Sequence, residues 1–179
     1  MHAQNLLELL EHYNPTDTDE IEYKKRIIDF VLSYANCFER SLAIGHITAS
    51  AWLLSKDKTH ALLMHHTKLD NWFQLGGHCD GNPDTCAVAI KEAQEESGIA
   101  HIIPVTKNIF DIDIHRIPDT PREKAHDHYD IRFLLQVTSN EQVIQNSESK
   151  ELRWISKNPQ DLPTQSRSVI RMFEKWCAL

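Results

Sequence analysis

The segment from residue 76 to residue 99 constrains this chain most, because a cluster of glycines leads there into a stretch with helical periodicity. Three of the five glycines of the protein, Gly76, Gly77 and Gly81, fall within six residues. Glycine has no Cβ, so the backbone can turn sharply and approach another group closely. We therefore expect a glycine-rich loop that lines a ligand or metal site.

A helix is predicted directly after this loop, over roughly residues 83–97. Asn82 can cap it, since its side-chain oxygen can accept a free backbone N–H. Pro83 suits the first helical position, where a missing N–H does no harm. Gly98 can end the helix in the left-handed conformation.

Glu92, Glu95 and Glu96 stand at helical positions i, i+3 and i+4, which lie on one face. At about 3.6 residues per turn, that face carries three carboxylates within an arc of about 100 degrees. Like charges at this spacing repel one another by a few tenths of a kcal/mol per pair. A divalent cation would offset this repulsion, because Mg²⁺ and Mn²⁺ prefer hard carboxylate oxygens. The alternative is a solvated acidic face.

The same segment resembles the Nudix box, G-x5-E-x7-R-E-U-x-E-E-x-G-U, where U is a bulky apolar residue. With the first glycine placed on Gly77, the spacing holds over all twenty-three positions. Three residues depart from the pattern: Pro83 replaces the first glutamate, Lys91 replaces the arginine, and Ala93 is small for U. Lysine supplies a charge but not the planar fork of arginine. The matching positions are Gly77, Glu92, Glu95, Glu96, Gly98 and Ile99.

This resemblance implies a metal-dependent hydrolase that cleaves a diphosphate linkage in a small molecule. We expect the substrate to be a nucleoside diphosphate linked to another group. Glu92, Glu95 and Glu96 would be catalytic. The same glutamates and the Gly76 carbonyl would bind Mg²⁺ or Mn²⁺. The implied fold class is α/β, a Nudix-like α/β/α sandwich with a mixed β-sheet between helices, over residues 42–179.

Residues 1–41 precede the resemblance and read as a helical segment. Apolar residues at helical spacing predict helices over 4–12 and 17–39. We interpret this segment as a cap on the core, with a homodimer contact or a substrate lid as alternatives. Farther along, strands are expected over 46–55, 60–66, 102–105, 109–116, 128–137 and 151–155, a loop over 117–125, and a final helix over 167–177.

A second group of polar residues follows the expected strand near residue 128. Because alternate residues of a strand share a face, His126, His128, Asp130 and Arg132 would line one side together. Asp111, Asp113 and His115 alternate in the same way on the strand before it. Such a face suits a substrate-phosphate site, with Arg132 on the phosphate, or an additional metal site. The alternative is an exposed amphipathic strand pair. We expect substrate contacts from His78, Lys91, His126, His128, Asp130 and Arg132.

Two further signals leave alternatives open. His78, Cys79 and Asp80 follow the box glycine, but Cys79 and Cys86 lack the spacing of a structural zinc site, which favours a polar loop over zinc. Many Nudix proteins also place an acidic residue on a late loop, as ligand or base. The candidates for that role are Glu123, Glu148 and Glu151.

Composition limits the class of protein. The formal charge of −7 argues against a general nucleic-acid or membrane-surface binder. No apolar run approaches the roughly 20 residues of a membrane span, and the N-terminus lacks the layout of a signal peptide. The four cysteines form no C-x-x-C pair. We therefore expect reduced thiols in a cytoplasmic protein that binds a small-molecule diphosphate.

Two alternative functions remain from the sequence. Isopentenyl diphosphate isomerases share the Nudix fold and use cysteine, histidine and glutamate, and Cys79 lies beside His78. Alternatively, the domain could sense a nucleotide without turning it over, because the first glutamate and the arginine of the box are replaced by Pro83 and Lys91.

Overall fold

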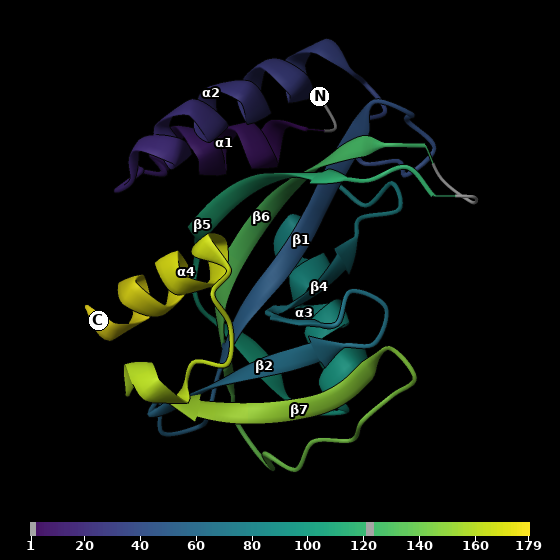
Figure 1. Ribbon diagram of the computed structural model, residues 1–179. Coiled ribbons are helices and arrows are strands. Elements are labelled where there is room, and N and C mark those ends of the chain that lie inside the picture. The colour runs from purple at the N-terminus through teal and green to yellow at the C-terminus, as the bar shows by residue number, and fades with distance from the viewer. Residues whose placement is uncertain (1–2, 121–123) are drawn as a thin grey trace.

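A mixed seven-stranded β-sheet lies between helices in the computed structural model, which describes residues 3–120 and 124–179 (Figure 1). β1 pairs in parallel with β6 and antiparallel with β2 and β4, while β5 pairs antiparallel with β6. The expected α/β class with a mixed sheet between helices is therefore confirmed. The strands are β1 Gly45–Leu54, β2 His60–His66, β3 Asn71–Phe73, β4 Leu75–His78, β5 Ile102–Ile117, β6 His126–Val137 and β7 Ser149–Ser156.

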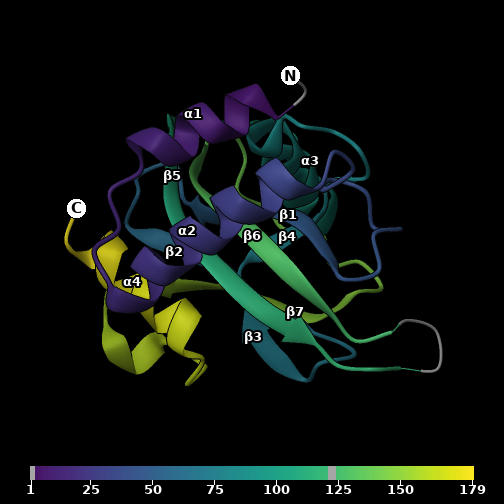
Figure 2. The ribbon, with the colours of Figure 1, turned by 90° about the horizontal axis from the view of Figure 1, so that it is seen from above.

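Helices cover both faces and one end of the sheet (Figures 1 and 2). α3 lies behind the sheet in Figure 1, α4 lies in front, and α1 and α2 cross above β5 and β6. Within the described residues, no helix is long and apolar enough to cross a membrane. The helices are α1 Gln4–His12, α2 Thr18–Ser33, α3 Thr85–Ser97 and α4 Arg167–Cys177, with a short 3₁₀ helix, η1, over Pro159–Asp161.

Several element boundaries differ from those expected, for local reasons. α2 ends at Ser33 rather than near residue 39, because the chain then turns to bury Cys37 and Phe38. The strands expected over 102–105 and 109–116 are one irregular strand, β5, which shifts register against β6. The loop expected over 117–125 partly lies outside the described residues.

The helix that carries the glutamates starts two residues later than predicted, and its cap is a different residue. Asp84, not Asn82, caps α3, and its Oδ1 accepts the backbone N–H of Ala87 at 3.0 Å. Asn82 instead accepts the N–H of Asp84, so that Pro83 lies in the turn before the helix. Gly98 ends α3 in the left-handed conformation with φ of 73°, as expected.

Apolar side chains cover the sheet on both sides. Ile47, Ala49, Ile131 and Phe133 lie in one buried cluster with residues of α1, α2 and α3. On the opposite face, α4 packs against a second cluster from β1, β2 and β6. Members of this second cluster include Trp52, Leu134, Val169, Met172 and Trp176.

Most of the polar face of β5 and β6 is buried, and only His115 and His128 are half-buried, so this face is not the exposed amphipathic pair of the alternative. Asp111 is fully buried and accepts hydrogen bonds from Arg132 at 3.0 Å, Arg171 at 2.9 Å and Lys175 at 2.8 Å. Burial alone would raise the pKa of Asp111, but these three cations hold it below its ordinary value. Lys175 also donates to Glu20 of α2, so the network joins the N-terminal helices to α4.

Replacing Arg171 by methionine should lower the free energy of unfolding by about 3–5 kcal/mol, because it leaves buried carboxylates without their partner. Urea denaturation measures this loss. Arg167→Met is the matched control on the same helix, since the Arg167 side chain is 71% exposed and pairs with Asp19 at 3.0 Å. The control should change stability by less than about 1 kcal/mol. Equal losses in the two variants would contradict a structural role for the network.

Candidate active site

The glutamates of α3 meet the backbone of β4 at two glycines, which lie within a strand and not in the expected loop. The N–H of Gly76 donates to Glu96 Oε2 at 2.8 Å. A Cβ on Gly77 would lie 2.4 Å from Glu92 Oε2, and one on Gly76 would lie 2.3 Å from Ser50 Oγ. Both positions therefore need glycine for close approach, which is the role the sequence predicted for them.

The three glutamates differ in their exposure to solvent. Glu96 is only 5% exposed, and burial raises its pKa to about 8, although the Gly76 N–H acts in the opposite direction. Burial also raises the pKa of Glu92, against the effect of Lys91. The Glu95 side chain is 58% exposed. The solvent exposure of the predicted acidic face therefore increases from Glu96, which is buried, to Glu95, which is largely exposed.

Lys91 takes the place of the box arginine and lies between two of these carboxylates. Its Nζ is 3.1 Å from Glu92 Oε1 and 3.2 Å from Glu95 Oε2. It thus holds both side chains on the same side of the helix with a single charge. Substrate binding by Lys91 stays a prediction.

A hard divalent cation fits this donor set. Glu96 and Glu92 carry charges that burial disfavours, and a cation would stabilise those charges where water cannot. Glu95 and the Gly76 carbonyl, also predicted as ligands, belong to the same helix and strand. Carboxylate and carbonyl oxygens are the ligands that Mg²⁺ and Mn²⁺ take.

Of the late acidic residues, Glu148 is the one whose charge raises the pKa of both Glu92 and Glu96. The loop that carries it also contacts α3, because Asn146 Nδ2 donates to the Glu95 carbonyl at 3.4 Å. Its backbone is fixed, because the Glu148 carbonyl accepts the N–H of Thr67 at 2.8 Å. Glu151 instead accepts from Arg153 at 2.9 Å, and Glu123 lies outside the described residues.

Histidines gather at one end of the same sheet. His46 of β1 lies opposite His128 of β6 in register, and their ring centroids are 4.8 Å apart. His78, at the end of β4, lies 5.0 Å from the His46 ring and 5.1 Å from the His128 ring. His126 and His115 contact the His128 ring at 5.0 Å and 5.3 Å. The sequence pointed to His78, His126 and His128 but not to His46, because the parallel pairing of β1 with β6 cannot be read from local patterns.

Asp130 and Arg132, predicted to bind substrate, are both 1% exposed. Asp130 accepts from Thr48 at 3.0 Å and Ser50 at 2.8 Å, and Arg132 donates to Asp130 at 2.7 Å. Arg132 also reaches Asp111 and Asp113. A phosphate contact by Arg132 stays a prediction, and in this conformation it would require these ion pairs to break.

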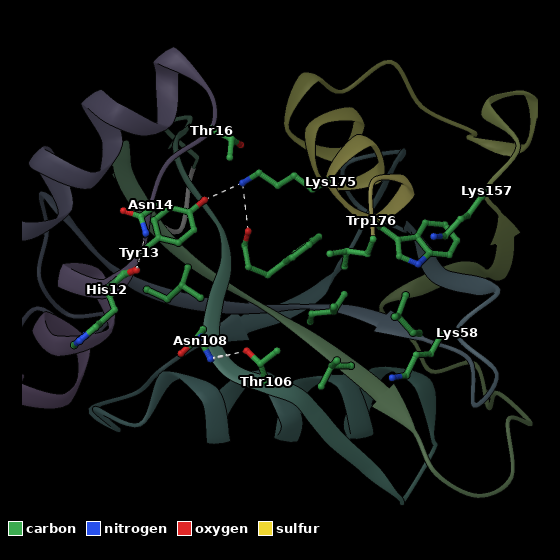
Figure 3. Close-up of a pocket in the computed structure, with 16 residues that line it drawn as sticks. His12, Tyr13, Asn14, Thr16, Lys58, Thr106, Asn108, Lys157, Lys175 and Trp176 are labelled. Atoms are coloured by element: carbon green, nitrogen blue, oxygen red, sulfur yellow. Dashed lines mark hydrogen bonds between the residues drawn. The ribbon is translucent and has the colours of Figure 1, made fainter.

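A hollow of about 590 Å³ lies elsewhere, between the α1–α2 connection, β5 and α4 (Figure 3). Its size is in the range of small-molecule sites. None of the site glutamates lines it, and its Lys175 is committed to Tyr13, Glu20 and Asp111. This hollow is therefore not where the acidic chemistry lies.

Comparison with known families agrees with this geometry. The NUDIX domain family matches residues 45–175. The match covers most of the chain, so this chain belongs to the NUDIX family and is a Nudix hydrolase. None of the curated proteins matches the sequence.

Solved structures show the same fold. A NUDIX family hydrolase from Clostridium perfringens is 25% identical with a TM-score of 0.52, over 73% of this chain and 95% of the other. An Ap4A hydrolase from C. elegans is 15% identical with a TM-score of 0.59, over 74% and 95%. The dihydroneopterin triphosphate pyrophosphohydrolase of E. coli is 15% identical with a TM-score of 0.56, over 74% and 94%.

Glu96→Gln should stabilise the metal-free protein. The pKa of Glu96 is raised above its unfolded value of about 4.5, so the folded state binds the extra proton between about pH 4.5 and 8. Over that window the wild type loses stability as pH rises, whereas the glutamine variant does not. We expect a gain on the order of 2–4 kcal/mol at pH 8 in EDTA and almost none at pH 4.5, measured by urea denaturation.

The control for this experiment is Glu95→Gln, at a position whose side chain is largely exposed. It should change stability by less than about 1 kcal/mol at either pH. A Glu96→Gln variant that is less stable than wild type at pH 8 would contradict the assignment of a burial cost to Glu96.

Proposed function

We propose that this chain is a Mg²⁺- or Mn²⁺-dependent hydrolase that cleaves the diphosphate linkage of a small molecule. The observation that supports this best is the position of Glu96 and Glu92 against the backbone of Gly76 and Gly77, with Glu95 on the same face of α3. These carboxylates, on which the charge of Glu148 also acts, are suited to divalent cations and to proton transfer.

The residues would divide the work as follows. Glu92, Glu95, Glu96 and the Gly76 carbonyl would hold the cation, and the Gly76 N–H fixes one oxygen of Glu96. When bound, the ion would neutralise charge on the diphosphate and acidify water. Glu148 would take the proton from the attacking water, because it is exposed to solvent and electrostatically coupled to Glu92 and Glu96.

For the substrate we propose a nucleoside diphosphate linked to another group. The structural relatives carry the names of hydrolases for Ap4A and for dihydroneopterin triphosphate. Their identity to this chain is 15%, which supports the fold and not one substrate over another. A cytoplasmic location and a homodimer stay predictions from the sequence.

The isomerase alternative has little support. Cys79 is 3% exposed, and burial raises the pKa of its thiol well above the ordinary value. A neutral, enclosed thiol is a poor acid or nucleophile at neutral pH. The sensing alternative predicts thermal stabilisation by a ligand without formation of a product.

Screening nucleotide sugars, dinucleotides, oxidised nucleotides and coenzymes with Mg²⁺ and Mn²⁺ should reveal phosphate-containing products. We expect Glu95→Gln and Glu96→Gln to abolish turnover, because each removes a charge that would hold the cation. Product formation is followed by chromatography. Turnover that persists in EDTA, or ligand-induced stabilisation with no product, would contradict the proposal.

Glu148→Gln should lower kcat by roughly 10²–10⁴-fold with little change in KM, because it removes the proton acceptor and leaves binding intact. The matched control is Glu151→Gln, three residues away and bonded to Arg153. Its kcat should stay within about twofold of wild type. Equal losses in the two variants would assign the base to another residue.

A further inference from the structure

The catalytic roles proposed above do not use the histidines at the end of β4 and on the neighbouring strands. Metal-binding atoms of His46, His78 and His128 all lie within 4.8 Å of one another. They come from three strands, β1, β4 and β6, whose pairing fixes them: His78 lies two residues after Gly76, and His46 lies opposite His128. A sheet holds side chains in place more rigidly than a loop would.

His46 is the observation that points to a ligand. It is 2% exposed, and neither ring nitrogen makes a hydrogen bond of normal geometry within the described residues, although the Leu42 backbone makes a weaker polar contact with the ring. Buried polar atoms in proteins nearly always have a partner, and one without a partner calls for an explanation. Packing alone would be served as well by an apolar ring.

His126 shows a hydrogen-bond pattern typical of metal ligands. Its Nδ1 lies 2.7 Å from the carbonyl of Lys124, which can only accept, so Nδ1 carries the proton. In the neutral ring, Nε2 then presents a lone pair, and it lies 3.2 Å from Nε2 of His128. Ligating histidines commonly donate their other N–H to a backbone carbonyl in this way.

From this geometry we propose that His46, His78 and His128 bind one transition-metal ion of the zinc class, with His126 as a fourth imidazole. Imidazole nitrogens suit Zn²⁺, Co²⁺ and Ni²⁺, whereas Mg²⁺ prefers the oxygens on α3. Ligand nitrogens on one tetrahedral zinc lie about 3.4 Å apart, so the three side chains would move inward by roughly 1 Å. This set of ligands shares no residue with the glutamate site, and metal binding by it does not depend on hydrolysis.

The alternative is that these histidines bind a substrate phosphate. His46 and His128 pack ring against ring, with centroids 4.8 Å apart, so charged forms of both would repel each other. Neutral imidazole is the form that binds metal, whereas a phosphate would be better served by charged rings.

The test measures metal content directly and needs no substrate. The tag-free full chain is stripped with chelator, incubated with equimolar Zn²⁺, desalted and analysed by mass spectrometry of the metal. Titration with Co²⁺ reports imidazole coordination through its visible absorption bands. The variants are His46→Gln, His128→Gln and the half-buried His78→Gln, each checked for folding by circular dichroism. Controls are His101→Gln, an exposed histidine outside the cluster, and Glu95→Gln.

Wild type and both controls should retain one equivalent of Zn²⁺, and each cluster variant that folds should bind at least tenfold more weakly. If His46→Gln fails to fold, His78→Gln decides the outcome. No retention by wild type overturns the proposal, as does unchanged affinity in the folded cluster variants. Loss of zinc in Glu95→Gln alone also overturns it, because the ion would then lie on α3.

Discussion

The close approach of β4 to α3 is the constraint on which the acidic site depends. Glu96 reaches the Gly76 N–H, and a Cβ on Gly77 would lie 2.4 Å from Glu92 Oε2, so the two glutamates fit against the strand because it carries no side chains there. The backbone of β4 is in turn paired with β1 in the centre of the sheet. As a result, the glutamates are placed by the core of the fold and not by a flexible segment. This placement lowers the stability of the metal-free protein, because the Glu96 carboxylate is buried without a cation beside it.

The N-terminal helices pack on the core of the NUDIX domain and are joined to it by buried ion pairs. Glu20 of α2 and Lys175 of α4 meet at 2.5 Å, and Lys175 continues to Asp111 of β5. Buried ionic groups of this kind give geometric specificity more clearly than they give stability. The network fixes where α1 and α2 lie over β5. A role for these helices as a cap, a dimer contact or a substrate lid stays a prediction.

The sequence was a good guide wherever the signal was local. The spacing of Glu92, Glu95 and Glu96, the stop at Gly98 and the helix over 167–177 each depend on a few consecutive residues, and each agrees with the structure. Long-range pairings gave no such signal. His46 could not be linked to His128, nor Glu20 to Lys175, because those contacts depend on strand order and helix placement. The sequence predicts Asn82 as the cap of α3 instead of Asp84, because these two residues, separated only by Pro83, both suit that role.

The side chains on one face of β6 change in type and in hydrogen-bond partners along the strand. Leu134 packs under α4, Arg132 and Asp130 are enclosed in ion pairs, and His128 lies at the end with other imidazoles. Charged groups need partners when buried, and here Thr48, Ser50 and Asp111 of the neighbouring strands supply them. At the end of the strand the polar side chains are imidazoles, whose nitrogens can act as metal ligands. Oxygen donors on α3 and nitrogen donors on the sheet thus form two different sets of ligands, and ions of different hardness would be sorted between them by ligand type.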